Sequence, residues 1–280
     1  MTTTPTWADA PVTDIQPRQL IVTIYGLYAR EEHNWLSVAA LVRLMAELGV
    51  DGQAVRSSVS RLKKRGILHS LAMSGAAGYA LSGGALAILR EGDTRIFRDY
   101  RAAAADGWVV AVFSVPERYR DKRHELRTRL SRLGFGTVAP GVWVAPIHVA
   151  AEAESVLARH NLDGYVDLFR GEHAGFGDLS TKIRVWWDLD ELAARYGAFS
   201  DQFGPVARRL ARRSVADRDA FAAYVPMLTA WRQLPYRDPG LPLELLPRPW
   251  HGETAAALFA ELNARLAEPA HRHAMAVIRG

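Results

Sequence analysis

The sequence predicts an α+β protein made of three consecutive parts, and three observations support this class. Residues 15–100 contain three amphipathic helices followed by a β-hairpin and another helix. Residues 105–188 alternate apolar strands with helices, and residues 189–280 show mainly helical periodicity. A chain of 280 residues also exceeds one typical domain, which holds about 100–200 residues. We therefore expect an N-terminal winged helix-turn-helix, a central ferredoxin-like module and a C-terminal helical domain.

The composition is that of a globular cytoplasmic protein. Hydrophobic residues make up 49% of the chain and charged residues 23%, and the apolar runs are too short to span a membrane. Residues 1–14 lack the basic and apolar stretches of a signal peptide, so we expect a disordered tail there. The absence of cysteine excludes disulfides, thiolate metal ligands and a cysteine nucleophile. The formal net charge of +5 permits a nucleic-acid partner but does not require one.

The first three helices have recognisable starts and ends. The first begins near Gln16, the second is capped by Ser37, and the third is capped by Asp51 and closed by Gly66. The segment after Gly66 reads as two short strands around the turn "SGAAG", and a further helix runs from Ser82 to about Tyr100. The apolar stripes of the first two helices consist of Leu20, Ile21, Ile24, Leu27 and Tyr28, and of Val38, Leu41, Val42, Met45 and Leu48.

The third helix, "DGQAVRSSVSRLKKRGIL", is the main functional candidate. Val55, Val59 and Leu62 form its apolar stripe, and at 100° per residue Gln53, Ser57, Ser60 and Lys64 lie opposite, flanked by Arg56 and Arg61. Small hydroxyl residues allow a close approach to DNA, and arginines reach phosphates or guanine edges. The lysines lack glutamates at helical spacing, unlike those of most solvated surface helices. The predicted DNA contacts are Gln53, Arg56, Ser57, Ser60, Arg61, Lys63, Lys64 and Arg65 of the helix, and His69 and Tyr79 of the hairpin.

The central part alternates strands and helices. An apolar strand from Trp108 to Val115 precedes a strongly basic helix with Leu126, Leu130 and Leu133 on its apolar side. "GTVAPGVWVAP" reads as the second strand region, "VAAEAESVLARH" as a helix and "GYVDLFR" as the third strand. From Asp178 the pattern predicts a short strand that passes into an aromatic-rich helix.

The last part is mostly helical. We expect the helix that contains "SVADRDAFAAYVPMLTAWRQL" to be broken at Pro226. A proline-rich stretch, residues 235–252, predicts an extended connector, followed by a final helix. The leucines of this connector, which would form an apolar strap able to wall a cavity, are Leu241, Leu243, Leu245 and Leu246.

Motifs throughout the chain resemble the phenylacetate-catabolism repressor (PaaX) family. The similarity rests on "LIVTIYGLYAR", "WLSVAALVRLMAELGVDGQAVRSSVSRLKKRGIL", "ALSGGALAIL", "GWVVAVFSVPERYRDKRHELRTRLSRLGFG", "GVWVAP" and "RDPGLPLELLPRPWHGETAAALF", in order from about residue 15 to the end. The resemblance implies a homodimeric bacterial repressor of an aromatic-acid catabolic operon. It implies a double-stranded DNA operator as partner, and release by an aryl-coenzyme A thioester such as phenylacetyl-CoA. The helix at residues 51–65 matches the DNA-contact positions, whereas no short motif identifies the effector site.

Such an effector requires an apolar slot for its ring and cations for its phosphates. We place the pocket where the Trp186 and Trp187 segment meets the 231–250 strap. Tryptophans are more often core residues, and "ARRLARR" is also compatible with a solvated face or with a second DNA-facing patch. The effector candidates are Trp143, Lys182, Arg184, Trp186, Trp187, Trp231, Arg232 and Trp250, with Tyr236, Arg208, Arg209, Arg212 and Arg213 as further possibilities.

Enzyme chemistry is weakly supported. A metal-dependent nuclease of the central fold would need an aspartate at the end of its first strand, where the sequence has Ser114, Val115 and Pro116. His271 and His273 are two residues apart, so a helix would turn them away from each other. We therefore predict no catalytic residue, no metal and no cofactor. An activator or architectural DNA-binding protein remains the alternative, because the sign of regulation depends on where the operator lies.

Overall fold

A computed structural model describes residues 15–97, 101–210 and 214–280. The disordered tail expected at residues 1–14, the predicted helix end at Tyr100, and the candidates Arg212 and Arg213 lie outside these ranges. Contacts divide the chain into two compact units. The first unit combines the described residues of Met1–Arg98 with Ala198–Arg232 and Thr254–Gly280, and the second combines those of Asp99–Gly197 with Gln233–Glu253. The boundary expected at residue 189 divides the chain by position in the sequence. These units are instead defined by contacts in space, so each combines segments that are distant in the sequence.

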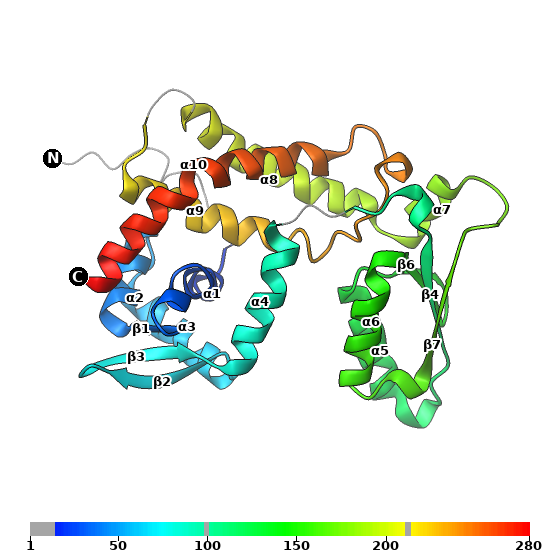
Figure 1. Cartoon of the computed structure of the whole chain (residues 1–280), viewed down its shortest axis with the longest axis horizontal. Coiled ribbons are helices and arrows are strands. Elements are labelled where there is room, and N and C mark those ends of the chain that lie inside the picture. Colours follow the sequence, from blue (N-terminus) through cyan, green and yellow to red (C-terminus); the bar gives the residue numbers. More distant parts are fainter. Residues whose placement is uncertain (1–14, 98–100, 211–213) are drawn as a thin grey trace. The chain divides into compact units, whose positions relative to one another are not determined.

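The N-terminal part of the first unit holds the three expected helices and the hairpin (Figure 1). The antiparallel sheet has the order β1-β3-β2, with Trp35 opposite Ala80 and Leu68 opposite Leu81. The elements are α1 (Pro17–Leu27), the 3₁₀ turn η1 (Ala29–Glu31), β1 (Trp35–Ser37), α2 (Val38–Glu47), α3 (Gly52–Lys64), β2 (Leu68–Met73), β3 (Ala76–Leu81) and α4 (Gly83–Phe97).

Strand β1 was not predicted, because three residues are too few to show a strand period. Trp35 holds this strand against the hairpin: its Nε1 donates to the backbone oxygen of Leu71 at 2.8 Å. The indole also covers Gly78, where a Cβ atom would lie only 2.4 Å from the Trp35 ring. The hairpin turns at Ser74 and Gly75, both with positive φ, as the two central residues of a type I′ turn require.

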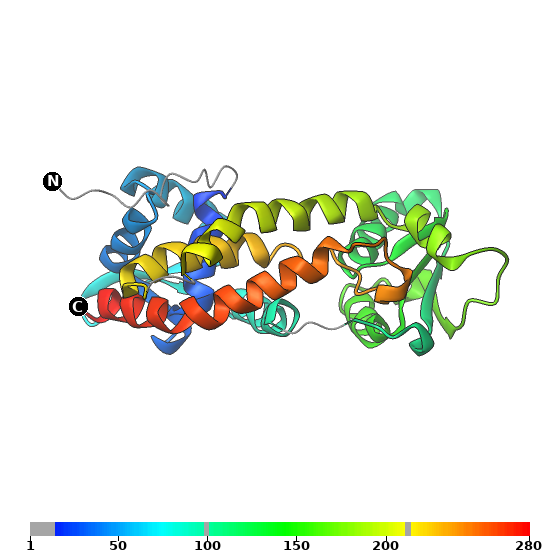
Figure 2. The same cartoon turned by 90° about the horizontal axis from the view of Figure 1, so that it is seen from above.

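Three further helices belong wholly or partly to the first unit: α8 (Leu189–Leu210), α9 (Asp217–Trp231) and α10 (His251–Arg279). Helix α9 packs against α1 through a buried hydrogen bond from Thr229 Oγ1 to Thr23 Oγ1, 2.7 Å long. It also lies along α10, where the Trp231 and Phe259 rings stack with centroids 4.4 Å apart (Figure 2). The C-terminal helices of this unit thus share a core with the N-terminal helices.

The predicted break at Pro226 is wrong, because α9 continues through this proline. An interior proline removes one backbone hydrogen bond and costs about 3 kcal/mol. Pro226 is buried together with its neighbours Val225 and Met227, so tertiary packing offsets that loss. Helices α8 and α10 likewise continue through Pro205 and Pro269.

The second unit is built on a four-stranded antiparallel sheet in the order β5-β6-β4-β7. Helices α5 and α6 cover one face of this sheet (Figure 1). Their core contains Val109, Ala111, Leu126, Leu130 and Trp143. The elements are β4 (Trp108–Phe113), α5 (Arg120–Arg132), β5 (Gly136–Ala139), β6 (Val142–Pro146), α6 (Ala150–Arg159) and β7 (Val166–Gly171).

Two sequence-based expectations for this unit need correction. The single strand region expected at 136–146 is a hairpin of two strands, which turns at Pro140 and Gly141, the latter with a φ of 79°. The short strand expected after Asp178 is instead helix α7 (Leu179–Trp186). Alternating β-branched residues there resemble a strand, but Asp178 Oδ2 accepts the backbone N–H of Thr181 at 2.9 Å and caps the helix.

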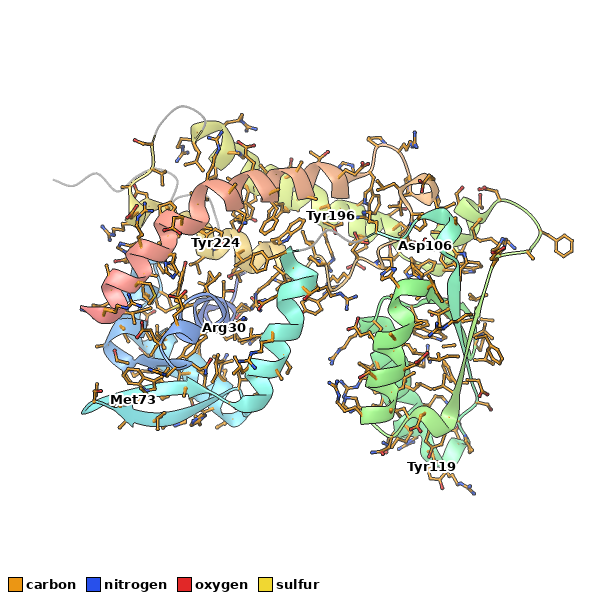
Figure 3. All side chains as sticks on the ribbon, in the orientation of Figure 1. Arg30, Met73, Asp106, Tyr119, Tyr196 and Tyr224 are labelled. Atoms are coloured by element: carbon orange, nitrogen blue, oxygen red, sulfur yellow. The ribbon has the colours of Figure 1, made fainter. Side chains whose placement is uncertain are left out.

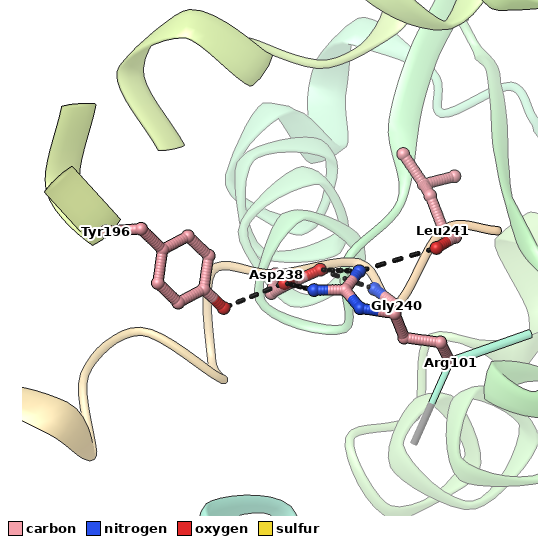
Figure 4. Close-up of polar contacts among 5 residues, drawn as sticks. All are labelled: Arg101, Tyr196, Asp238, Gly240 and Leu241. Atoms are coloured by element: carbon pink, nitrogen blue, oxygen red, sulfur yellow. Dashed lines mark hydrogen bonds and ion pairs between the residues drawn. The ribbon is translucent and has the colours of Figure 1, made fainter. Parts of the chain in front are cut away.

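The proline-rich connector is only partly extended: residues 235–237 form a turn, Leu243–Leu245 form the 3₁₀ turn η6, and His251 and Gly252 already belong to α10. Its anchor is Asp238, which accepts from Arg101 Nη2 at 2.6 Å and from the Tyr196 hydroxyl at 2.8 Å (Figure 4). The backbone N–H of Gly240 donates to the same carboxylate at 2.8 Å. Both charged side chains are largely buried, with 16% of Arg101 and 9% of Asp238 exposed. This cluster holds the connector against the central module.

Replacing Asp238 by alanine should destabilise the protein by about 3 kcal/mol, because the largely buried Arg101 and the Tyr196 hydroxyl would lose the carboxylate to which they donate. Urea denaturation followed by circular dichroism measures this loss. Glu244→Ala, an exposed change in the same connector, is the control and should cost far less. Equal losses in the two variants would contradict the anchoring role of Asp238.

Candidate DNA-binding surface

Helix α3 is positioned by its caps and by its apolar stripe. Asp51 Oδ1 accepts the backbone N–H groups of Gln53 at 2.8 Å and Ala54 at 2.9 Å. These hydrogen bonds lower the pKa of the Asp51 carboxyl, and the one from Ala54 has the larger effect. Gly66, with a φ of 68°, ends the helical segment. Arg61, Lys63 and Lys64 lie in the last turn, where positive charge favours the helix dipole.

The structure exposes every predicted contact residue of α3 and buries its stripe. Val55, Val59 and Leu62 are buried, and α3 packs against α1 and α2. Ser58 is buried as well, although nothing in the pattern distinguished it from Ser57 and Ser60. The exposed predicted residues are Gln53, Arg56, Ser57, Ser60, Arg61, Lys63, Lys64 and Arg65.

The basic side chains of α3 form no ion pair with the described residues, although the charge of Arg56 contributes to the lowered pKa of Asp51. Among the described residues, no carboxylate lies within 4.0 Å of a charged nitrogen of Arg56, Arg61, Lys63, Lys64 or Arg65. Five like charges on one exposed surface attract polyanions and repel one another. The surface therefore has the charge that a phosphate backbone requires.

The hairpin braces the end of α3. Lys63 Nζ donates to Ser70 Oγ at 2.7 Å and lies 5.7 Å from the centroid of the Tyr79 ring. Ser70 and Tyr79 are directly paired across β2 and β3. The Tyr25 hydroxyl donates to the backbone oxygen of Tyr79 at 3.0 Å, and burial raises the pKa of Tyr25, so it stays a neutral donor. The bracing residues Trp35, Gly78 and Tyr25 were not singled out, because their role depends on contacts distant in the chain.

The two predicted hairpin contacts do not share one face. His69 is exposed on β2, next to Ser70. Side chains alternate along a strand, so His69 points to the face opposite Ser70 and its partner Tyr79. The structure therefore brings Tyr79, but not His69, together with the end of α3.

The effector candidates are divided between the two units. Trp231 and Arg232 belong to the first unit, where Trp231 Nε1 donates to the Ile96 backbone oxygen at 3.0 Å and Arg232 Nη2 to that of Gln19 at 3.2 Å. Both side chains are thus held within that unit's packing. The candidates of the second unit are Trp143, Lys182, Arg184, Trp186, Trp187 and Trp250.

Within the second unit, α7 and the residue that follows it provide most of the candidates. Trp187 Nε1 donates to the Gly134 oxygen at 2.9 Å, and its ring packs on Gly136, leaving no room for a Cβ there. Trp186 lies against Trp187, with ring centroids 6.2 Å apart. Lys182 Nζ lies 3.5 Å from His173 Nε2.

The remaining candidates of this unit differ in exposure. Trp143 is a core residue of the central module, and Trp250 is buried beside Tyr196. Arg184 is exposed on α7. Helix α7 also contacts η6 of the connector. This part of the second unit therefore contains both aromatic rings, Trp186 and Trp187, and a cation, Lys182.

The described residues hold neither a metal-binding cluster nor a membrane-spanning helix. They contain no group of three histidine or acidic side chains arranged to hold a metal ion. None of their helices has the length and apolar character needed to cross a membrane.

Three family models match consecutive parts of the chain. PaaX-like protein matches residues 16–85, PaaX protein central Cas2-like domain matches residues 101–183, and PaaX-like protein C-terminal domain matches residues 187–276. Together these matches include α3, the four-stranded sheet and the C-terminal helices. The chain belongs to the PaaX family.

Two known proteins are similar over most of the chain. The sequence is 27% identical over 258 residues to the transcriptional repressor PaaX of Escherichia coli (strain K12), covering 90% of this chain and 80% of that protein. The solved structure of the uncharacterized protein Rv0674 from Mycobacterium tuberculosis matches with a TM-score of 0.58 at 20% identity, covering 89% of this chain and 99% of that one. At this identity the second likeness shows the fold alone.

The cap of α3 should make stability depend on pH in a defined direction. The pKa of Asp51 is lowered below 3.8 in the folded protein, so its contribution is complete above that pH and is lost as the pH falls through the folded value. The difference in melting temperature between the wild type and Asp51→Ala should therefore be largest near neutral pH and shrink below 3.8. Circular dichroism melts at several pH values measure it. Asp121→Ala, an exposed carboxylate, is the control. A difference that does not change with pH would show that Asp51 does not act through its charged form.

Proposed function

We propose that this protein is a DNA-binding transcriptional repressor that reads duplex DNA with α3. The observation that carries the proposal is the exposed basic surface of α3, which forms no ion pair among the described residues, with Ser57 and Ser60 between Arg56 and Arg61. Small hydroxyls permit close approach to the groove, and the arginines supply phosphate and guanine contacts. The name of the E. coli relative, a transcriptional repressor, supports this assignment.

The arrangement of elements supports the finer architecture. Three helices followed by the β2–β3 hairpin, with β1 completing a small sheet, correspond to a winged helix-turn-helix within residues 15–100. The chain order β4-α5-β5-β6-α6-β7 and the sheet order β5-β6-β4-β7 correspond to a ferredoxin-like module within residues 105–188. Residues 189–280 supply the helical C-terminal part.

We propose a cytoplasmic homodimer whose two copies of α3 read two half-sites of an imperfect palindrome. An effector can relieve repression only if it binds more tightly to a dimer geometry in which the two helices no longer match that spacing. The proposed effector is an aryl-CoA thioester, phenylacetyl-CoA being the first to test. Its proposed site lies in the second unit, around Lys182 and Trp186 of α7 and the neighbouring connector.

Arg56→Ala and Arg61→Ala should each weaken binding to the operator and reduce the slope of log affinity against log salt by about 0.9 if the lost contact is to phosphate. Fluorescence anisotropy measures both quantities, with a duplex from the region upstream of the gene and an unrelated duplex of equal length. Arg265→Ala, which removes an exposed arginine of α10, is the matched control. Unchanged affinity in both α3 variants would show that another element enters the groove.

Phenylacetyl-CoA should dissociate the operator complex and quench tryptophan fluorescence, whereas free CoA and phenylacetate should do neither at the same concentration. Lys182→Ala should raise the concentration needed for release, because it removes a cation placed to meet the CoA phosphates. Arg159→Ala, on the exposed side of α6, provides the control. Selective DNA binding that ignores every thioester tried would retain the repressor and refute this effector class.

A further inference from the structure

Helix α5 carries a second concentration of positive charge, which the proposed function does not use. This helix covers the central sheet of the second unit, and Tyr119 lies directly before its first residue (Figure 3). Leu126 and Leu130 form its buried side. Its cationic and histidine residues are Arg120, Lys122, Arg123, His124, Arg127, Arg129 and Arg132.

Carboxylates neutralise one part of this charge. Glu125 lies 3.4 Å from Lys122 Nζ, 3.5 Å from Arg129 Nη2 and 3.7 Å from His160 Nδ1 of the segment after α6. The hydrogen bond from Lys122 is the main reason that the pKa of Glu125 is lowered. These ion pairs neutralise the cationic side chains on the side of α5 that faces α6.

Glu117 neutralises a further arginine at the start of the helix. Its Oε2 lies 2.9 Å from Arg123 Nη1. The other terminal nitrogen of Arg123 donates to the Val115 backbone oxygen at 2.6 Å. Arg123 is therefore held by the segment that follows β4 and by Glu117.

The remaining flank presents a row of free polar residues. Arg120, His124, Arg127 and Ser131 are four, seven and eleven residues apart, so they fall within an arc of about 60° and extend over about 16 Å. All four are exposed. Across residues 15–97, 101–210 and 214–280, no carboxylate lies within ion-pair distance of Arg120 or Arg127. Asp121 is exposed but lies outside this arc. We call these four residues the α5 row.

The chemistry of the α5 row fits a phosphate backbone. Arginine binds phosphate through two parallel hydrogen bonds, and serine and histidine are further donors to phosphate oxygens. Duplex DNA carries one negative charge per about 1.7 Å of its axis, so a row of about 16 Å meets several phosphates. The row has no apolar or aromatic residue that would favour an apolar protein partner.

We propose that the α5 row binds phosphates of the operator duplex outside the segment that α3 reads. It adds affinity that is independent of sequence, because phosphate contacts carry no base information. This inference rests on the proposed function, since it assumes that duplex DNA is the partner.

The test compares the full-length wild type with Arg120→Gln/Arg127→Gln in anisotropy titrations at several salt concentrations. The double variant should bind a long upstream duplex and an unrelated duplex of equal length more weakly by the same factor. Its salt slope should fall by about 2, corresponding to two lost phosphate contacts. Arg120→Lys/Arg127→Lys, which retains both charges, should preserve most of the slope. If only the Gln variant loses affinity, the loss is caused by the missing positive charges and not by misfolding.

The control is Arg195→Gln/Arg265→Gln, which removes the same net charge from two exposed arginines that pair with glutamates four residues earlier. Equal slopes for this control and for the α5 variant would overturn the inference. Loss of the dimer in the α5 variant, measured by analytical ultracentrifugation, would also overturn it, because the row would then face a second copy of the chain.

The Arg56 and Arg61 variants separate this inference from the proposed function. If they weaken operator binding and the α5 variant does not, only the α5 inference fails. If the α5 variant alone weakens binding, the assignment of α3 fails and the α5 inference stands. A wild type that binds no duplex at all overturns both.

Discussion

The exposed side of α3 is determined by the burial of its apolar stripe, Val55, Val59 and Leu62, because a helix can pack only one side against its neighbours. Full burial of each such side chain contributes about 1.5–3 kcal/mol, which is enough to hold the helix in one orientation against α1 and α2. Ser57 and Ser60 are then directed outward with the basic residues. The candidate function of this surface depends on that orientation.

The pattern of ion pairs separates structural charges from charges available to a partner. Asp238 binds Arg101, and Glu125 binds Lys122 and Arg129, so these cations stabilise packing. The cations of α3 and of the α5 row have no such carboxylate among the described residues. Unpaired arginines at exposed positions cost self-repulsion without stabilising the fold, which is why they point to an external polyanion.

The C-terminal part connects both compact units through the chain. Helix α9 shares the buried Thr229–Thr23 hydrogen bond with α1, and α10 places His273 Nε2 2.6 Å from Glu47 Oε2 of α2. The connector between these helices belongs instead to the central module through Asp238. The connector therefore links the central module covalently to α9 and α10, the helices that pack on the candidate DNA-binding part.

The sequence by itself determined the α+β class, the caps Ser37 and Asp51, and the exposed face of α3, because each depends on residues close together in the chain. The tertiary structure alone established that β1 pairs with β3 and that α9 passes through Pro226. These outcomes depend on partners far along the chain, whose packing outweighs local preference. The same reason applies to the effector candidates: Trp231 and Trp186 belong to different compact units because of contacts that no local pattern encodes. The ion pairs on α5 are instead local, since Glu125 lies three and four residues from Lys122 and Arg129.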